Sequence, residues 1–424
     1  MEVTRTSQFF LIATVIIFLS ACGQTQTEEV FPLESQSCLE QSIPHEYLVS
    51  WKTGELTVEQ GEDRQSFINN FVSPNLDRIE HIESHKRIQI ETGDTQDYSF
   101  TAGEIDNWGA RTTGASEAWK RGFKGEGVIV AVVDSGVDRT HNQLAGQIYS
   151  NPGETGLDDN GIDKRQNGID DDNNGYIDDY AGYDFTSDSG EVEDTSSHGT
   201  HVAGIIAAHH NDTEISTEHV QGVAPEATLL PIDFIGPAGG TTADAVLAID
   251  YAVKMGAKVI NASWGGGPCS TTLGQRIRQL ENDDVLFINA AGNGQPGRNI
   301  DEYIEYPASF NLAPQITVGS ITSYGGMARH SNYGDRNVHL FAPGFAIYST
   351  VPEQGVRALT GTSMATPFVS GAAALLWSFK PSLSAKEVKQ ILMTSVKMDP
   401  DYHNQTHGTL NISEALALAE SFLP

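Results

Sequence analysis

From residue 108 onward, short apolar segments alternate with segments of helical spacing. The run Gly127–Val133 (GVIVAVV) is continuously apolar, which is typical of a strand buried on both faces of a sheet. Further strands are expected at residues 228–234, 259–262, 285–290, 315–320 and 338–341, and helices at 202–208, 242–255 and 363–379, with another opening at 384. This alternation predicts an α/β fold with a mostly parallel central sheet and helices on both faces. In such sheets, active sites form at the carboxyl ends of strands.

The first 22 residues resemble an export signal rather than part of the fold. Arg5 precedes the apolar run Phe9–Ala21, which is short for a membrane span but suits a signal peptide. The run ends in Leu19–Cys22 (LSAC), which resembles the lipobox of bacterial lipoproteins, where the cysteine is lipidated and becomes the new N-terminus. The alternative is an ordinary cleaved signal with an incidental Cys22. Either reading predicts an extracytoplasmic protein, and a single lipid would tether the chain rather than embed it.

Composition shifts along the chain suggest four further segments. Residues 23–44 are polar without periodicity, so we expect a flexible spacer. Residues 45–93 are expected to form a small α+β unit, with strands at 46–51 and 85–91 and a helix at 64–72. Residues 94–106 are again polar and are interpreted as a linker, which leaves 107–424 as the main domain.

Charge and cysteine content limit the partners of this chain. The 424 residues include 56 acidic and 25 basic side chains, a formal net charge of −31. Such a surface repels nucleic acid, so we expect no nucleic-acid partner. We expect a monomer that reaches a membrane through a lipid anchor at most. Outside the cytoplasm, Cys38 and Cys269 could form a disulfide, or remain two free thiols.

Amide hydrolysis needs a nucleophile, a base, a group that orients the base, and donors for the oxyanion. Asp134 ends the buried strand and is followed by Ser135-Gly136. A carboxylate there could hold an imidazole in one tautomer. The tripeptide Asp-Ser-Gly occurs again at Asp188, but only Asp134 follows a buried strand.

His198 is the candidate base. It lies in SSHGTHVAG, where a loop enters a helix of small residues, and a helix start is expected to hold the imidazole pKa near or below neutral. His201 is expected to be buried support, and His407, in a second His-Gly-Thr, a surface residue. A zinc pair at His198 and His201 is disfavoured, since helical zinc pairs are spaced i, i+4 with a Glu between them.

Ser363 and Asn293 supply the other two groups. Gly361-Thr362-Ser363 enters an apolar helix, so Ser363 would sit at a helix N-terminus, where free N–H groups favour a developing negative charge. An ordinary helix cap is the alternative. Asn293, in NAAGNG, could donate to an oxyanion, or simply form an Asn-Gly turn.

Taken in order, the contexts AVVDSGVD, SSHGTHVAG, NAAGNG and GTSMATPFVSG resemble those of subtilisin-like serine proteases, the subtilases. The resemblance covers roughly residues 107–420. It implies that Asp134 orients the base, His198 acts as base and then acid, Ser363 attacks the peptide carbonyl, and Asn293 donates to the oxyanion. The related sedolisins use a Glu base and an Asp at the oxyanion site, which His198 and Asn293 argue against.

The resemblance also implies a substrate edge and a zymogen. The segment Ser263-Trp264-Gly265-Gly266 is similar to the family's substrate-binding edge strand, to which a peptide could add as an extra strand. Residues 45–93 are more loosely similar to the inhibitory propeptide, so the chain would be cleaved near residues 91–106. The cleavage would separate a lipid on Cys22 from the mature protease, unless a Cys38–Cys269 bond or failed cleavage retains it.

An acidic insertion indicates a second chemistry. The segment starting at Asp170, DDDNNGYIDD, contains the D-x-D-x-N-G pattern of a calcium loop. The expected ligands are Asp170, Asp172, Asn174, the Tyr176 carbonyl, and Asp178 or Asp179. Position 12 is Ala181 rather than Glu, so an EF-hand is not implied. An acidic surface loop is the alternative.

The expected function is therefore an exported serine endopeptidase, made as a zymogen, that acts on peptides or proteins and binds structural Ca²⁺. One alternative is a dedicated processing protease or transpeptidase with a single partner, which would use the same triad. The other is a non-catalytic peptide-binding protein on the same scaffold.

Overall fold

The computed structural model describes residues 26–90, 104–267 and 269–421 of the chain. The chain forms two compact units, Met1–Arg87 with Ser270–Thr272 and Ile88–Cys269 with Leu273–Pro424. The expected signal peptide, the lipobox at Cys22 and most of the expected linker 94–106 lie outside the described residues. Of the helices that are described, none combines the length and the apolar content that crossing a bilayer requires.

The N-terminal unit is a small α+β structure. Strand β1 (Ser42–Trp51) pairs antiparallel with β2 (Leu56–Gln60) on one side and with β3 (Ile79–Ile88) on the other. The helical segment between β2 and β3 consists of α3 (Arg64–Phe67), a π-helical turn (Ile68–Val72) and α4 (Ser73–Asn75). The expected strand at 46–51 and helix at 64–72 match this structure, whereas β2 was not anticipated.

Part of the expected spacer belongs to this unit. Helix α2 (Gln36–Leu39) precedes β1, and Phe31 is fully buried. The Phe31 ring packs edge-on against Tyr47 and Phe67, and its carbonyl accepts a hydrogen bond from Arg64 at 2.6 Å. The prediction of a flexible spacer at 23–44 is therefore wrong for residues 26–44, because one buried aromatic side chain outweighs the polar residues around it.

The second unit is built on one large sheet. In the described part of the chain its strand order is β14-β15-β11-β10-β9-β8-β4-β6-β5, and neighbouring strands run parallel except for β14 and β15. The strands are β4 (Ile129–Asp134), β5 (Tyr183–Asp184), β6 (Thr228–Asp233), β8 (Val259–Ala262), β9 (Leu286–Ala290), β10 (Gln315–Ile321), β11 (Leu340–Pro343), β14 (Lys397–Met398) and β15 (Gly408–Thr409). This confirms the expected α/β class with a mostly parallel sheet.

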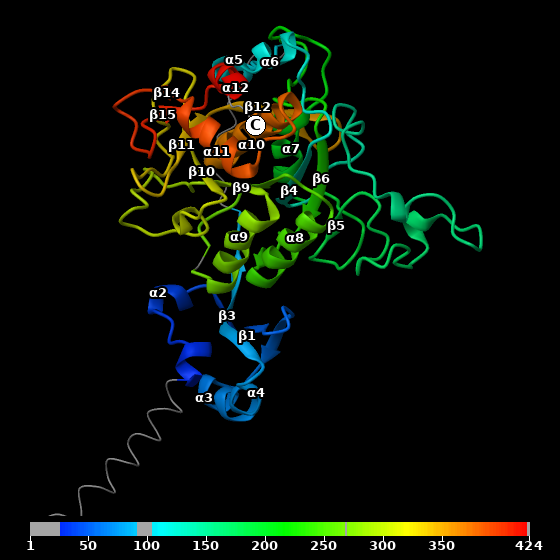
Figure 1. Ribbon diagram of the computed structural model, residues 1–424, viewed down its shortest axis with the longest axis vertical. Helices are drawn as coiled ribbons and strands as arrows, with labels where there is room; N and C mark the ends of the chain where they lie inside the picture. The colour runs from blue at the N-terminus through cyan, green and yellow to red at the C-terminus, as the bar shows by residue number, and fades with distance from the viewer. Residues whose placement is uncertain (1–25, 91–103, 268, 422–424) are drawn as a thin grey trace, which may run out of the picture. The chain divides into compact units, whose positions relative to one another are not determined.

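Helices cover both faces of this sheet. Helices α7 (His198–Ala207) and α10 (Thr362–Phe379) pack against each other and against the central strands, while α8 (Thr242–Lys254) packs on β4 and β6. Figure 1 shows α8 and α9 (Thr271–Asp283) on the opposite side of the sheet from α7 and α10. The remaining helices are α5 (Trp108–Thr113), α6 (Ala115–Lys120), α11 (Ala385–Thr394) and α12 (Ile412–Ser421).

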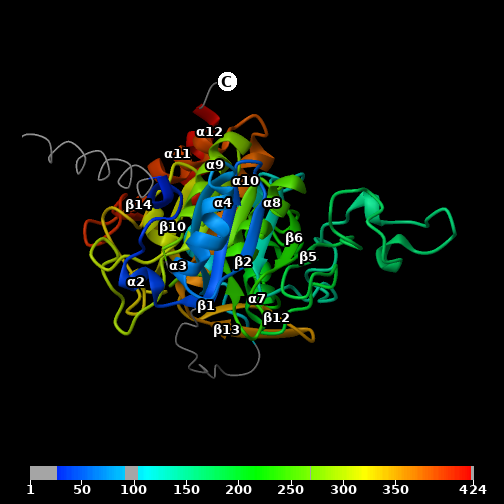
Figure 2. The same ribbon diagram turned by 90° about the horizontal axis from the view of Figure 1, so that it is seen from below.

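Two features lie outside this sheet. The hairpin β12 (Ile347–Val351) and β13 (Gly355–Leu359) packs against α7 through β12. The insertion between residues 150 and 182 extends outward beside β5 and β6 in both Figures 1 and 2, and contains only two short 3₁₀ turns among its described residues, Pro152–Glu154 and Lys164–Gln166.

Candidate active site

Asp134 and His198 form a buried pair at the carboxyl end of β4. The Nδ1 atom of His198 lies 2.7 Å from Oδ1 of Asp134, which also accepts a hydrogen bond from the Ser135 N–H at 2.9 Å. Asp134 is fully buried and His198 is 8% exposed. Because the carboxylate occupies Nδ1, it fixes the tautomer in which Nε2 is free to accept a proton. Nε2 has no hydrogen-bond partner within the described structure.

Small residues allow this close approach. A Cβ atom on Gly199, at the start of α7, would lie 2.0 Å from the Gly136 carbonyl oxygen. Any side chain at 199 would therefore push the first turn of α7 away from the turn that follows Asp134. Because residue 199 is glycine, the backbone at the start of α7 can contact the backbone of Gly136. This contact brings the His198 imidazole close to the Asp134 carboxylate.

The pKa of His198 differs from the sequence-based expectation. Burial lowers this pKa, but the Asp134 carboxylate, with a smaller contribution from Asp194, outweighs burial and raises it above its ordinary value. The prediction of a pKa near or below neutral neglected the negative charges of Asp134 and Asp194. The ion pair favours the imidazolium that forms during proton transfer.

The competing histidines have other environments. His201 is fully buried, and its Nε2 lies 3.0 Å from the carbonyl oxygens of Ile347 and Arg357. Burial lowers the pKa of His201 to about 3, so it stays neutral and supports the β12–β13 hairpin, as expected. In the second His-Gly-Thr, Nδ1 of His407 lies 2.9 Å from the Tyr402 carbonyl, and the residue is exposed.

Ser363 is the second residue of α10 and faces the residue after β8. Its hydroxyl donates to the Ser263 carbonyl at 2.8 Å, and the Ser263 hydroxyl donates to the Ser363 carbonyl at 2.9 Å. The Ser363 hydroxyl is therefore not bonded to His198 in this structure. Rotation about its Cα–Cβ bond would release it from Ser263.

Asn293 is held next to the same helix start. Its Oδ1 accepts hydrogen bonds from the backbone N–H of Thr362 at 3.0 Å and from the Thr362 hydroxyl at 3.2 Å. Because an N–H can donate only to the amide oxygen, these bonds orient Nδ2 as a donor. A Cβ atom on Gly361 would lie 3.7 Å from both Asn293 Nδ2 and the Ser363 nitrogen. The Asn293 side-chain amide and the Ser363 N–H, which are both hydrogen-bond donors, thus lie near the same position beside Gly361.

One chain of contacts links these groups. The Trp264 indole donates to the Val133 carbonyl at 3.0 Å, one residue before Asp134, and Ser263 is bonded to Ser363 as described above. The Trp264 side chain is 1% exposed and packs edge-on against Phe234. In the expected substrate segment 263–266, the side chains of Ser263 and Trp264 therefore point into the protein, and only the backbone is suited to meet a peptide.

The acidic insertion brings together a different set of residues than expected. The carboxylates of Asp170 and Asp172 form a cluster with Glu154, with one ligand atom of each residue within 4.8 Å of the others. Asn174 joins this cluster through its backbone N–H, which donates to Asp170 and Asp172 at 3.0 Å each. The Tyr176 N–H donates to the side chain of Asn174 at 2.8 Å.

Asp178 and Asp179 lie outside the cluster. Both carboxylate oxygens of Asp178 accept from the Gly168 N–H at 3.1 Å. Those of Asp179 accept from the side chains of Asn151, Asn174 and Tyr251 at 2.8–3.0 Å, which ties the insertion to α8. The prediction that one of these two residues supplies the last carboxylate is not supported by this geometry, because other donors already occupy both.

Glu154 is the residue that sequence analysis missed. It lies in a 3₁₀ turn well before the D-x-D-x-N-G pattern, and its Oε1 accepts from the backbone N–H groups of Asp171 and Asp172 at 2.7 and 3.2 Å. Glu154 is fully buried, and within the described residues its Oε2 has no hydrogen-bond partner. Burial raises the pKa of this carboxyl to about 7. An unpartnered buried carboxylate oxygen beside two other carboxylates fits a hard cation.

Comparisons with known proteins identify the family of this chain. Residues 125–415 match the family model described as "Subtilase family". The chain is 34% identical to the major intracellular serine protease of Bacillus subtilis over 74% of this chain and 89% of that protein, and 31% identical to subtilisin DY of Bacillus licheniformis over 71% and 95%. A cold-adapted subtilisin-like serine proteinase of known structure superposes with a TM-score of 0.54 at 29% identity, covering 68% of this chain and 90% of that one. The chain belongs to the subtilase family and is a serine-type peptidase.

Proposed function

We propose that this peptidase hydrolyses peptide bonds through an acyl-enzyme, with Asp134, His198 and Ser363 as its triad and Asn293 as oxyanion donor. The observation that carries the proposal is the 2.7 Å hydrogen bond from His198 Nδ1 to the buried Asp134, which leaves Nε2 as a base without a competing partner. The helix-start position of Ser363 and the orientation of Asn293 complete the set of required groups.

In this mechanism the Ser363 hydroxyl leaves Ser263 and gives its proton to Nε2 of His198 while Oγ attacks the peptide carbonyl carbon. Asn293 Nδ2 and the Ser363 N–H stabilise the resulting oxyanion. The C–N bond then breaks, the amine takes the proton from His198, and an ester on Ser363 remains. A water molecule that loses its proton to His198 hydrolyses this ester and restores the serine.

A protease assay with casein and a peptide library tests the proposal, with Ser363→Ala beside Ser378→Ala, a serine near the other end of α10. We expect wild type and Ser378→Ala to be active and Ser363→Ala to be inactive. A fluorophosphonate probe should label wild type, and mass spectrometry should place the adduct on Ser363. An unlabelled, inactive wild-type protein would favour the binding protein, and cleavage or ligation of one partner alone would favour the processing enzyme or transpeptidase.

The backbone of residues 263–266 would bind the substrate by strand addition. These residues follow β8 without forming part of a strand, and the Cβ position of Gly265 lies near the Gly292 backbone, next to Asn293. Main-chain hydrogen bonds would supply affinity without restricting the substrate side chains. We therefore expect broad specificity from a monomeric enzyme.

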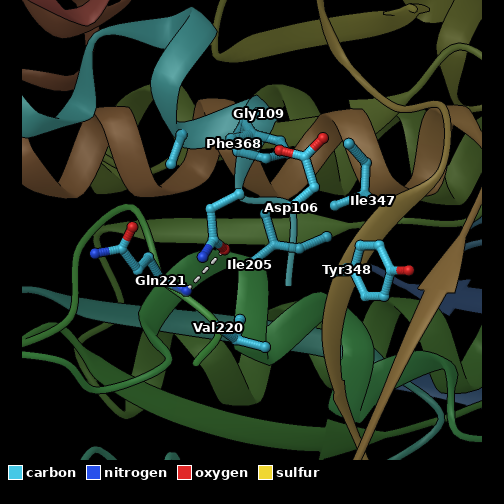
Figure 3. A pocket seen from close by; sticks show the side chains of 10 residues that line it. Asp106, Gly109, Ile205, Val220, Gln221, Ile347, Tyr348 and Phe368 are labelled. Carbon is cyan, nitrogen blue, oxygen red and sulfur yellow. Dashed lines mark hydrogen bonds between the residues drawn. The ribbon is translucent and has the colours of Figure 1, made fainter. Parts of the chain in front are cut away.

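We also propose that the N-terminal unit is an inhibitory propeptide and that cleavage falls before Ile105. The Ile105 N–H donates to the Thr217 carbonyl at 3.0 Å, and the Asn107 side chain donates to the carbonyls of Ser216 and His219. Asp106 and Gly109 line a small cavity (Figure 3), and the Asn107 side chain accepts a hydrogen bond from the Gln221 N–H at 3.1 Å. Cleavage after Asn107 would remove these contacts from the mature chain, so we expect the cut before Ile105.

The mature N-terminus, read by mass spectrometry, tests this proposal. Wild type should begin between the end of the N-terminal unit and Ile105, and Ser363→Ala should keep the N-terminal unit. A wild-type protein that is active with its N-terminal unit still attached would contradict the zymogen.

The signal sequence supports export with a lipid on Cys22, and cleavage of the propeptide would release the protease. In the structure, Cys38 and Cys269 are both disulfide-bonded, so neither is a free thiol. The membrane fraction of wild type, Ser363→Ala and Cys22→Ser should be compared, with and without dithiothreitol. We expect Ser363→Ala to be retained with or without dithiothreitol, and wild type to be released when dithiothreitol is present. Equal retention of wild type would contradict release, and its loss on reduction would identify a disulfide tether.

Finally, we propose that Glu154, Asp170 and Asp172, with Asn174 beside them, hold a structural Ca²⁺ ion. The unpartnered Oε2 of the buried Glu154 supports this proposal more directly than the acidity of the loop does. The ion would balance the buried charge and fix the insertion. Calorimetric titration of the chelator-treated protein with CaCl₂ should give saturable binding that Glu154→Gln weakens, and unaltered binding in that variant would exclude this ligand.

A further inference from the structure

A further acid, the half-buried Asp194, joins the two segments that carry the candidate base and its orienting carboxylate. Its Oδ1 accepts from the Ser135 hydroxyl at 3.0 Å and from the N–H groups of Ser196 and Ser197 at 3.0 and 2.8 Å. Its Oδ2 accepts from the Thr200 N–H at 2.8 Å. One carboxylate thus binds a loop, a helix start and the turn after β4.

The Ser135 hydroxyl completes the connection. It accepts from the Ser196 hydroxyl at 2.7 Å and from the Gly199 N–H at 3.1 Å, while the Ser135 backbone N–H donates to Asp134. Ser135, whose N–H contacts the Asp134 carboxylate, is therefore joined to Gly199, the residue after His198, through the Ser135 hydroxyl. Asp194 orients this hydroxyl.

Helix α7 depends on Asp194 for its first turn. The residue before it, Ser197, has a φ of 70° and makes no side-chain cap. The bond from the Thr200 N–H to Asp194 replaces that cap with a negatively charged one, which also interacts favourably with the helix dipole. His198 is the first residue of this helix, so its backbone position follows from the Asp194 bonds.

We propose that Asp194 is a positioning residue for catalysis, which sets the distance and angle of the His198 ring relative to Asp134 through Ser135 and the first turn of α7. This inference rests on the proposed roles of Asp134, His198 and Ser363. Catalytic groups need to be held within about 0.5 Å of their productive geometry, and rigid partners behind them supply that precision.

The charge of Asp194 also affects the pH dependence of catalysis, because it contributes to the pKa of His198. Burial lowers the pKa of His198, and the negative charges of Asp134 and Asp194 raise it. His201 is neutral, and burial beside Asp184 raises the pKa of Asp233, at the end of the neighbouring strand β6, to about 8. Asp134 and Asp194 are therefore the anions that favour imidazolium. The acid limb of kcat/KM, which reports the free enzyme, should lie above 6.5 in wild type and move to lower pH when the Asp194 charge is removed.

The test is Asp194→Asn, with Asp301→Asn as a matched control. Asp301 also accepts from two backbone N–H groups, those of Arg336 and Asn337, in a loop remote in sequence from the triad segments. For Asp194→Asn we expect kcat to fall about tenfold to a hundredfold with little change in KM, and the acid limb to shift to lower pH. The control should keep both properties, whatever it loses in Tm.

Three outcomes are decisive. If Asp194→Asn has the wild-type kcat and acid limb, or loses activity equally at every pH in proportion to its loss of Tm, the inference fails. If Asp194→Asn does not fold, Ser135→Ala decides. It removes the hydroxyl that connects Asp194 to the turn after Asp134 and leaves the bond from Asp194 to the first turn of α7. An unchanged kcat in Ser135→Ala would overturn the inference. Activity in Ser363→Ala would instead refute the proposed function itself.

Discussion

The strand-end site and the acidic insertion each contain a fully buried carboxylate, Asp134 and Glu154, but they restrain it differently. Asp134 lies at the end of β4, and its partner, His198, begins α7, so regular elements place both groups. Glu154, Asp170 and Asp172 lie in loop, where the loop's own backbone N–H groups hold their oxygens. At the first site, a protonated His198 can balance the negative charge of Asp134. At the second, no basic side chain among the described residues forms an ion pair with Glu154, Asp170 or Asp172. Each site leaves one buried carboxylate oxygen without a hydrogen-bond partner in the described structure, Oδ2 of Asp134 and Oε2 of Glu154. The difference indicates a site built for proton transfer and a site built for an ion.

Replacement of His198 should give the largest effect that separates the two regions. We expect His198→Ala to lower kcat by about a millionfold, the scale that loss of the equivalent group has in subtilisin, with Ca²⁺-dependent stability unchanged. His407→Ala is the matched control, since it alters the same tripeptide at an exposed position. Steady-state kinetics measure both, and a comparable loss in His407→Ala would undermine the assignment of the base.

A smaller loss is expected from the oxyanion donor. Asn293→Ala should lower kcat by about 100- to 1,000-fold with little change in KM, by the precedent of subtilisin. Asn293→Asp keeps the acceptor for Thr362 but replaces the Nδ2 donor with a negatively charged oxygen. If the Asp variant were as active as wild type, Asn293 would be a structural residue only.

For the insertion the expected effect is on stability and reverses with the ion. At 100 times Kd, a bound ion adds about 2.7 kcal/mol, which corresponds to a rise in Tm of several degrees. Glu154→Gln should lose most of this rise. In EGTA it should melt no lower than wild type, because the amide removes an unbalanced buried charge. Differential scanning calorimetry with and without CaCl₂ measures this, and an equal Ca²⁺ response in both proteins would contradict the site.

The smallest effect is expected at Asp178. Both of its oxygens accept from Gly168 outside the cluster, and the residue is only half-buried. Asp178→Asn should keep the Ca²⁺ response and change stability by less than about 0.5 kcal/mol. A response lost in Asp178→Asn and kept in Glu154→Gln would restore the ligand set read from the sequence.

These two regions also differ in how far their sequences could be interpreted. Each catalytic residue lies at an element boundary with its own local pattern: an apolar run before Asp134, small residues after His198, and a glycine before the helix of Ser363. Such patterns are local, so the sequence by itself determined the fold class and the order of the motifs along the chain, and the combination of the motifs identified the candidate catalytic groups.

Only the tertiary structure decided the remaining features. Glu154 joins Asp170 through a loop whose path has no periodicity, and Phe31 is buried among residues that otherwise suggest a spacer. Asp194 acts through Ser135, and the two are brought together by the meeting of β4 and α7. The raised pKa of His198 likewise depends on charges distant in sequence. Hydrogen bonds and electrostatic energies depend on distances in space, and only folding determines those distances.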